Sequence, residues 1–200
     1  MTSPRNEAPA EALVEAPAAD PAPDAIAPDT KDWTWVLERP CADCGLDTPA
    51  VVREDVAGMI LANAEAWQAV LSGDDGELRR RPEPGIWSDL EYACHVRDVF
   101  RLFHVRLGLM LDQENPLFPN WNQDETAVSG RYQEQRPQDV AADLAAGARI
   151  LADAFEQVSG EQWQRTGRRS DGASFTVESF SRYLIHDPVH HLYDVTGTAL

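Results

Sequence analysis

The chain has 200 residues, enough for one domain with a hydrophobic core, and its formal net charge is −17. This acidic sequence has no basic stripe that could displace counterions from phosphate, so we expect neither a nucleic-acid partner nor binding to anionic membranes. No stretch reaches the ~18 uncharged apolar residues that a membrane-spanning helix requires.

Residues 1–30 differ in composition from the rest of the chain. They are rich in Pro, Ala and acidic residues and contain no aromatic residue. Such a segment has too little apolar surface to offset the entropy of ordering, so we predict a disordered tail followed by one folded domain over residues 31–200. The tail lacks the features of a secretory signal or a transit peptide. We therefore expect a cytoplasmic protein, in which an odd number of cysteines argues against a disulfide framework.

The first two predicted helices cover residues 53–71 and 89–111. The first carries apolar side chains at three- and four-residue spacing and ends in a Ser-Gly-Asp-Asp-Gly run. The second follows Ser88 and has Glu91 at the third position after it, which is the pattern of a capping box. An Asn-Pro pair stops the second helix.

The next two predicted helices cover residues 137–158 and 176–195. Pro137 suits a first helical turn, and Thr176 is a plausible N-cap. Residues 112–136 form a loop that is long for a bundle, and long loops are often functional. Strand signals are nearly absent, so the sequence predicts an all-α fold, a four-helix bundle.

Three of the five histidines lie in the last predicted helix, in the run His-Asp-Pro-Val-His-His. His186 and His190 are four residues apart, which places both imidazoles on one face of a helix, one turn apart. One helix cannot surround an ion, so a third ligand must come from a facing helix. His95, in the middle of the second helix, is the best candidate. Three neutral imidazoles suit zinc, iron, nickel or copper and leave coordination positions open.

Several observations weaken this interpretation. A His-x-x-x-His pair alone is a weak signal, because histidines on helices also serve as caps or surface groups. Pro188 removes a helical hydrogen bond and disfavours helical geometry at Asp187. A kink of the helix at this point would change the directions in which His186 and His190 point. His191 points about 100° away from its neighbour. His104 is half a turn out of phase with the predicted ligand on its helix, so we expect neither histidine to bind metal.

Two cysteines form a Cys41-x-x-Cys44 pattern, which is typical of a zinc knuckle or a redox site. A full zinc site needs a second ligand pair, and the sequence has no second Cys-x-x-Cys; a thioredoxin-type role would need a βαβ context. We therefore interpret the pair as part of a packed or turn-forming segment, with metal binding or redox activity as the alternative. Cys94 points about 100° away from His95 and is expected in the core.

Other side chains are candidates for supporting roles. Asp98 and Asp194 lie three and four residues from predicted ligands and could orient them, although a surface position is the simpler interpretation. Most of the six tryptophans should be packing anchors. Trp87 and Trp121 are the two that could line a pocket.

Taken together, these motifs resemble those of the DinB-like (YfiT-like) superfamily. The run IWS at residues 86–88, followed by HVRD at 95–98, is similar to the family's Trp-Ser/Thr … His-Leu-x-Asp segment. The run HDPVHH at 186–191 is similar to its second motif. The run WVLERPCADCG at 35–45 is similar to that of a subgroup from high-GC Gram-positive bacteria. The resemblance covers about residues 33–196.

The resemblance implies a four-helix bundle that binds one divalent metal ion (zinc, nickel, iron or manganese) through His95, His186 and His190. Characterised members of the superfamily include thiol-dependent transferases and an isomerase that use mycothiol or bacillithiol, and several members form homodimers. The resemblance thus implies that the partners of this chain are a small-molecule thiol and an electrophile. It also implies that the chain forms a homodimer. Pro188 departs from the commonest family pattern, which bears on the ligand geometry.

Two classes of function stay open. The first is a metal-dependent thiol S-transferase, in which a mycothiol-type thiol binds the ion as thiolate and attacks a small electrophile. The second is a non-catalytic, metal-binding or stress-associated helical bundle. An enzyme should have an open metal position beside a pocket, whereas a structural site should be closed by a fourth protein ligand.

Overall fold

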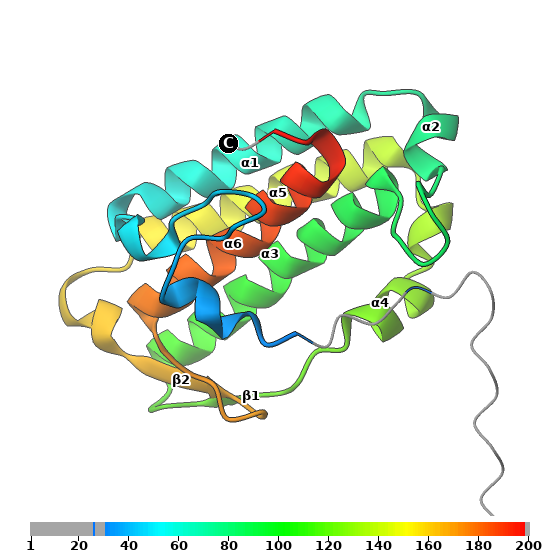
Figure 1. The fold of residues 1–200 in the computed structure, drawn as a ribbon. Helices are drawn as coiled ribbons and strands as arrows, with labels where there is room; N and C mark the ends of the chain where they lie inside the picture. Colours follow the sequence, from blue (N-terminus) through cyan, green and yellow to red (C-terminus); the bar gives the residue numbers. More distant parts are fainter. Residues whose placement is uncertain (1–25, 27–30, 199–200) are drawn as a thin grey trace, which may run out of the picture.

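The computed structural model describes residue 26 and residues 31–198. Four long helices form a bundle: α1 (Val56–Leu71), α3 (Asp89–Asp112), α5 (Pro137–Glu156) and α6 (Val177–Thr196). Helices α1 and α3 each pack against both α5 and α6, so the order around the bundle is α1, α5, α3, α6 (Figure 1). The predicted four-helix bundle is confirmed, and each long helix lies within a few residues of its predicted range.

The helix ends explain why the boundaries were predictable. Ser88 and Glu91 form the predicted capping box at the start of α3, with the Ser88 N–H donating to the Glu91 carboxylate at 2.9 Å. Pro137 occupies the first turn of α5. The Thr176 hydroxyl accepts a hydrogen bond from the Ser179 N–H at 3.1 Å at the start of α6. Each such N-cap stabilises its helix by about 1 kcal/mol.

The interior of the bundle is filled by the apolar stripes of the four long helices. Its largest fully buried side chains include Ile60, Trp67, Phe100, Leu107, Met110, Leu144, Leu151, Phe180 and Leu184. Burying each of them stabilises the fold by roughly 1.5–3 kcal/mol relative to an exposed position. This core holds α3 and α6 against each other, and these two helices carry all five histidines of the chain.

A small sheet packs at one end of the bundle (Figure 1). Its strands are β1 (Leu117–Phe118), β2 (Thr166–Arg169) and β3 (Ser174–Thr176), in the order β1-β2-β3. The pair β1–β2 is parallel and the pair β2–β3 is antiparallel. The sequence does not predict this sheet, because strands of two to four residues are too short to show a periodic pattern.

Short elements complete the described part of the chain. The segment predicted as a loop, residues 112–136, contains β1 and the short helix α4 (Gln123–Ser129), and α2 (Asp75–Arg79) follows α1. The 3₁₀ turns are η1 (Trp33–Leu37), η2 (Thr48–Ala50), η3 (Arg53–Asp55), η4 (Tyr132–Glu134) and η5 (Gly160–Gln164). Turns η1 and η2 lie against α6.

Within the tail that the sequence predicts to be disordered, the structure describes one residue, Ile26, which is half-buried against the core. The remainder of residues 1–30 lies outside the described part of the chain. Among the described helices, none combines the length and apolar character needed to cross a membrane. The described structure therefore consists of the helical bundle, its small sheet and the turns that precede the bundle.

Candidate metal centre

Helix α6 continues through Pro188 without a break from Val177 to Thr196. Proline has no N–H to donate, so the carbonyl of Leu184 lacks its usual helical partner. The carbonyl of Pro188 itself accepts a hydrogen bond from Asn63 Nδ2 of α1 at 2.8 Å, which ties the two helices together at this point. The proline therefore leaves the residues on either side of it on one continuous helix.

Metal-ligating side chains gather in two groups among the described residues. The first, here called the cysteine site, consists of Cys41, Cys44, His186 and His190, and the second, here called the pocket site, consists of His95, Asp187 and His191. Within each group the ligand atoms all lie within 4.8 Å of one another. Because neighbouring helical residues point about 100° apart, α6 contributes two ligands to each site in two different directions.

The structure divides the three predicted ligands between these two sites. His186 and His190 lie together with their ring centroids 5.0 Å apart, as their spacing predicts. His95 lies instead with Asp187 and His191. Binding of one ion by His95, His186 and His190 together stays a prediction, and metal analysis of single variants can test it.

At the pocket site, His95 is completely buried, and its Nε2 lies 3.3 Å from Asp187 Oδ1. The rings of His95 and His191 meet edge to face with centroids 4.9 Å apart. His95 Nδ1 has no hydrogen-bond partner among the described residues, and the contact of Nε2 with Asp187 falls short of hydrogen-bond geometry. An unsatisfied buried polar group costs about 1–3 kcal/mol, and a bound cation would remove that cost. The donor set of two imidazoles and one carboxylate therefore fits a divalent metal ion.

A carboxylate on the next turn of α6 orients one of these ligands. Asp194 Oδ2 lies 3.0 Å from His191 Nδ1, while His191 Nε2 is 3.9 Å from Asp187 Oδ2. Asp194 Oδ1 is also 3.7 Å from His190 Nε2. A carboxylate on one imidazole nitrogen fixes the ring so that the other nitrogen can bind an ion. Asp194, which the sequence suggested as a partner of His190, thus lies closer to His191.

The electrostatics favour the metal-binding protonation states of Asp187, His186 and His190. Burial acts to raise the pKa of Asp187, but the charges of His95 and His191 outweigh it and hold that pKa well below its usual range. Burial lowers the pKa of His186 to about 4. Burial likewise lowers the pKa of His190. At neutral pH the carboxylate is therefore charged, and His186 and His190 are neutral.

Two tryptophans enclose His95. The Trp121 indole stacks on the imidazole with centroids 5.3 Å apart and an interplanar angle of 12°, and Trp87 lies on it at 5.1 Å. Trp121 Nε1 donates a hydrogen bond to Thr126 Oγ1 at 2.8 Å, which anchors the indole to the start of α4. Trp121 also lines a pocket of about 430 Å³, as was considered from its position in the long loop.

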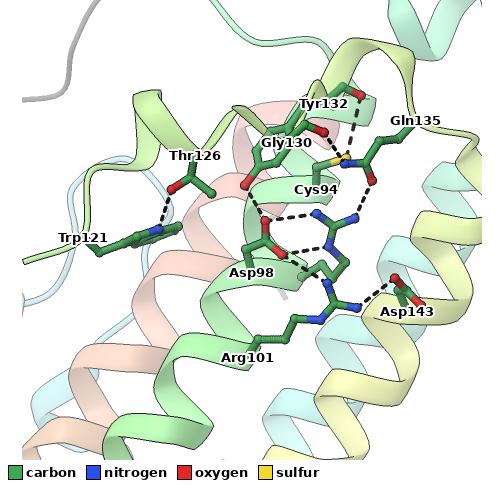
Figure 2. A network of polar contacts seen from close by, with 10 residues as sticks. Cys94, Asp98, Arg101, Trp121, Thr126, Gly130, Tyr132, Gln135 and Asp143 are labelled. Atoms are coloured by element: carbon green, nitrogen blue, oxygen red, sulfur yellow. Dashed lines mark hydrogen bonds and ion pairs between the residues drawn. The ribbon is translucent and has the colours of Figure 1, made fainter. Parts of the chain in front are cut away.

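A polar network holds the segment after α4 against α3 (Figure 2). Asp98 accepts hydrogen bonds from Arg97 at 2.9 and 3.0 Å and from the Tyr132 hydroxyl at 2.6 Å. Arg97 also donates to Gln135 Oε1 at 2.5 Å. Asp98 therefore supports the backbone near the site rather than orienting a metal ligand. The Cys94 thiol is fully buried and 3.9 Å from the Tyr132 carbonyl, which confirms its predicted place in the core.

The pocket of about 430 Å³ is lined by four ligand candidates of α6: Asp187 and His191 of the pocket site, and His186 and His190 of the cysteine site. Two guanidinium groups, Arg106 and Arg169, also line it. Burial, and then the charge of Arg169, lowers the pKa of Arg106 to about 10. Arg106 donates to the Pro119 carbonyl at 3.1 Å, but its buried Nε has no partner among the described residues. The pocket therefore presents cationic donors close to the candidate metal ligands.

Sequence reasoning did not single out Asp187 and His191 as candidate ligands, and it did not foresee that the two cysteines meet two histidines. The available signal was that Asp187 and His191 repeat, one residue later, the four-residue spacing of His186 and His190. For the cysteines, burial was foreseen: Cys41 and Cys44 are each 2% exposed. The two histidines that lie with them come from a segment more than a hundred residues later, which local spacing does not reveal.

Comparisons with known proteins agree with this fold. The model of a family described as the DinB superfamily matches residues 60–195. Among solved structures, YfiT from Bacillus subtilis superposes with a TM-score of 0.66 over 72% of this chain and 84% of that chain, at 18% sequence identity. YfiT is described as a probable metal-dependent hydrolase with an unusual four-helix bundle topology. No curated protein sequence matches the chain significantly. The likeness to YfiT shows a shared fold.

Proposed function

The chain belongs to the DinB superfamily, and on that basis we propose that it is a metal-dependent enzyme that transfers a small-molecule thiol to an electrophilic substrate. The observation that carries the proposal is the pocket site, where His95, Asp187 and His191 converge beside a pocket. A set of three protein ligands leaves a coordination position for a reactant, which is typical of catalytic rather than structural sites.

The residues of the pocket site have distinct roles in this proposal. A divalent ion (zinc, nickel, iron or manganese) bound there would lower the pKa of a thiol or a water molecule and so supply a nucleophile at neutral pH. His95, Asp187 and His191 hold the ion, and Asp194 fixes the ring of His191. Trp121 covers His95 and restricts the access of bulk water to it.

The pocket lining indicates the chemical class of the substrates. Its volume of about 430 Å³ is in the usual range for a site that binds a small molecule. The guanidinium groups of Arg106 and Arg169, which line the pocket, are placed to bind a carboxylate or phosphate group of the electrophile. Phe103 and Trp33 supply apolar surface for the remainder of the reactants, of which a mycothiol-type thiol is the proposed nucleophile.

Hydrolysis is the second candidate function. It is favoured by the fold shared with YfiT, which is described as a probable metal-dependent hydrolase. The same pocket-site residues would serve, with water in place of the thiol as the nucleophile. A non-catalytic metal-binding bundle is the third alternative, and it predicts metal binding without turnover of either kind.

The decisive experiment combines metal analysis with a thiol-consumption assay on the full-length protein. Mycothiol and a chromogenic aryl electrophile bearing a carboxylate are the probes. We expect His95→Ala and Asp187→Asn each to lose one equivalent of metal and to lower the conjugation rate by at least about 100-fold. His104→Ala is the matched control, because His104 also lies on α3 but belongs to neither site, and it should keep both properties.

The other outcomes separate the alternatives. Metal-dependent cleavage of ester or amide substrates without thiol conjugation would replace transfer by hydrolysis. A wild-type protein that binds metal but turns over neither class of substrate would favour the non-catalytic bundle. If His95→Ala and His190→Ala each removed the same single ion, the three-histidine site predicted from the sequence would replace the pocket site.

A further inference from the structure

We propose that Cys41, Cys44, His186 and His190 form a second metal site, a closed tetrahedral zinc site that fastens the N-terminal segment of the domain to α6. This proposal does not depend on the function proposed for the pocket site, since it concerns different ligands. It rests on four observations: the spacing of the ligand atoms, their burial, the turn that carries the cysteines and the aromatic cover above the histidines.

The spacing of the ligand atoms matches a tetrahedral zinc ion. Zinc lies about 2.3 Å from a cysteine sulfur and about 2.0–2.1 Å from a histidine nitrogen, so a tetrahedral arrangement separates sulfur and nitrogen by about 3.6 Å. Cys41 Sγ lies 3.6 Å from His190 Nδ1. All four ligand atoms lie within 4.8 Å of one another. No large rearrangement is therefore needed for two sulfurs and two nitrogens to bind one ion.

The cysteine site offers four protein ligands, one more than the pocket site, and they are largely buried although His186 and His190 also line the edge of the pocket. Cys41 and Cys44 are each 2% exposed and His186 is 4% exposed, while the side chain of His190 is 11% exposed. The Nε2 atom of His186 is buried and has no hydrogen-bond partner among the described residues. Two thiolates also balance the charge of a divalent cation, which suits a buried position. Four protein ligands with no open position are typical of structural zinc.

The cysteines lie in a turn whose backbone places both thiols on one side. The Gly45 N–H donates to the Cys41 carbonyl at 3.0 Å, and the Cys41 N–H donates to the Leu46 carbonyl at 2.9 Å. Gly45 has a φ of +75°, which glycine adopts without strain and other residues rarely adopt. The Cys-x-x-Cys-Gly sequence therefore forms a compact knuckle, and α6 supplies the second ligand pair that the sequence by itself lacks.

Aromatic side chains of η1 cover the histidines of the cysteine site. The Trp33 indole lies 5.4 Å from the His186 ring and 5.1 Å from the His190 ring, measured between centroids. Trp35 approaches His186 edge-on at 6.3 Å. An ion at this site would cross-link segments separated by 149 residues in sequence, Cys41 and His190, and hold Trp33 at the wall of the pocket. Such a long-range cross-link restricts the unfolded chain and favours the folded one.

The first test replaces zinc with cobalt in the full-length protein and records its absorption spectrum. A Cys2His2 site gives thiolate-to-cobalt charge-transfer bands, which the cysteine-free pocket site cannot produce, together with the d–d bands of tetrahedral cobalt. We expect these bands in the wild type and in Asp187→Asn, and we expect their loss in the Cys41→Ser/Cys44→Ser double variant. Cys94→Ser is the matched control, because Cys94 is the third buried cysteine and lies outside both sites.

A second measurement keeps the proposal testable even if the double variant does not fold. In the zinc-loaded Asp187→Asn variant, which lacks the pocket ion, Cys41 and Cys44 should react with a thiol reagent only after a chelator is added, with one zinc released for every two thiols that become reactive. His190→Cys keeps four ligands and should retain this zinc, whereas His190→Ala should lose it. Absence of the charge-transfer bands, immediate reaction of both thiols, or a Cys41–Cys44 disulfide in the purified protein would each overturn the proposal.

Discussion

Asp98 shows how one side chain connects several segments of this fold. Its carboxylate receives hydrogen bonds from Arg97 and from the Tyr132 hydroxyl, and Arg101 lies 3.4 Å away. The Arg97 side chain is only 7% exposed, so removing its partner would leave a buried guanidinium uncompensated. We expect Asp98→Ala to lower the free energy of unfolding by about 3 kcal/mol, measured by urea denaturation.

Asp143→Ala is the control for this substitution, because Asp143 pairs with Arg101 at 2.8 Å in an exposed position. Exposed ion pairs stabilise proteins by about 0–1 kcal/mol, so this variant should stay within that range. Equal losses in the two variants would contradict the structural role assigned to Asp98.

The same carboxylate predicts a pH dependence of stability. Burial acts to raise the pKa of Asp98, but the hydrogen bonds from Arg97 and Tyr132 and the charges of Arg97 and Arg101 lower it below its usual value. A carboxyl with a lowered folded-state pKa stabilises the protein above its unfolded-state pKa of about 3.9 and loses this contribution as the pH falls through the folded-state value. Below pH 4, the wild type should therefore lose stability faster than Asp98→Asn.

This prediction is checked by denaturation of both proteins at several pH values, with a chelator present throughout so that metal release does not contribute. The difference in unfolding free energy between wild type and Asp98→Asn should be constant at neutral pH and shrink as the pH falls below about 4. A difference that does not change with pH would show that the charge of Asp98 is not what stabilises the network.

The candidate ligands show what sequence patterns can and cannot supply at the residue scale. Spacing identified His186 and His190 as a pair on one helical face, and the structure places them together. The pair Asp187 and His191 has the same spacing, so the pattern alone has two equivalent solutions. Which pair faces His95 depends on the rotation of α6 about its axis, and the packing of the whole bundle fixes that rotation.

At the scale of elements, two glycines show how closely the secondary structures approach one another. A Cβ on Gly167 of β2 would lie 2.5 Å from a Phe118 ring carbon and 2.8 Å from Met110 Cγ, so the sheet packs directly on the end of α3. A Cβ on Gly147 of α5 would meet its nearest neighbours, on α3, at 3.8 Å, which is ordinary contact. The two positions therefore differ in the room available for a methyl group.

We expect alanine substitutions at these glycines to have opposite effects. Gly167→Ala should destabilise the protein by about 1–3 kcal/mol, because the methyl group overpacks the contact with Phe118 and Met110. Gly147→Ala should stabilise it by about 0.5–1 kcal/mol, because alanine loses less conformational entropy in a helix interior. Thermal and urea denaturation of both variants provide the measurement. Destabilisation by Gly147→Ala would indicate closer packing of α3 and α5 than the structure has.

The segment between β1 and α4 contributes the cover of the pocket site. Trp121 stacks on His95 and is anchored by its hydrogen bond to Thr126. An aromatic pair of this kind adds about 0.5–1.5 kcal/mol, so Trp121→Ala should weaken metal binding at His95 by about two- to tenfold. Trp121→Phe preserves stacking and should have a smaller effect. Competition with a chromogenic chelator measures both, and identical affinities in all three proteins would contradict a role for the indole.

The elements also differ in how far they were predictable. The four long helices were predicted because each is amphipathic over many turns, and α3, α5 and α6 also begin at a recognisable cap or at Pro137. The sheet was not predicted, since its strands are short and are specified by contacts such as that of Gly167 with Phe118 rather than by local alternation. Helix α4 has seven residues, which is too short for a clear periodic signal.

At the scale of the whole molecule, bound metal should contribute measurably to stability. A ligand present at about 1,000 times its dissociation constant stabilises the folded state by about 4.1 kcal/mol. For a domain of 150–250 residues, 1 kcal/mol shifts the melting temperature by about 2–4 °C. Removing zinc from the cysteine site with a chelator should therefore lower the melting temperature by roughly 8–16 °C.

Differential scanning calorimetry of the full-length protein with and without chelator provides this measurement. The Cys41→Ser/Cys44→Ser variant should melt near the chelated wild type and respond much less to the chelator, since the proposed zinc ligands are already removed. A chelator-induced shift of equal size in both proteins would assign the stabilisation to the pocket site alone.

Helix α6 supplies ligands to both candidate metal sites, and this sharing has a thermodynamic consequence. His190 and His191 are adjacent on one continuous helix, so any rotation or shift of α6 produced by an ion at one site also displaces ligands at the other. Linkage then requires reciprocity: if zinc at the cysteine site changes the affinity of the pocket site by some factor, an ion in the pocket changes the affinity for zinc by the same factor. The N-terminal knuckle and the pocket would in that way be energetically coupled through one turn of helix.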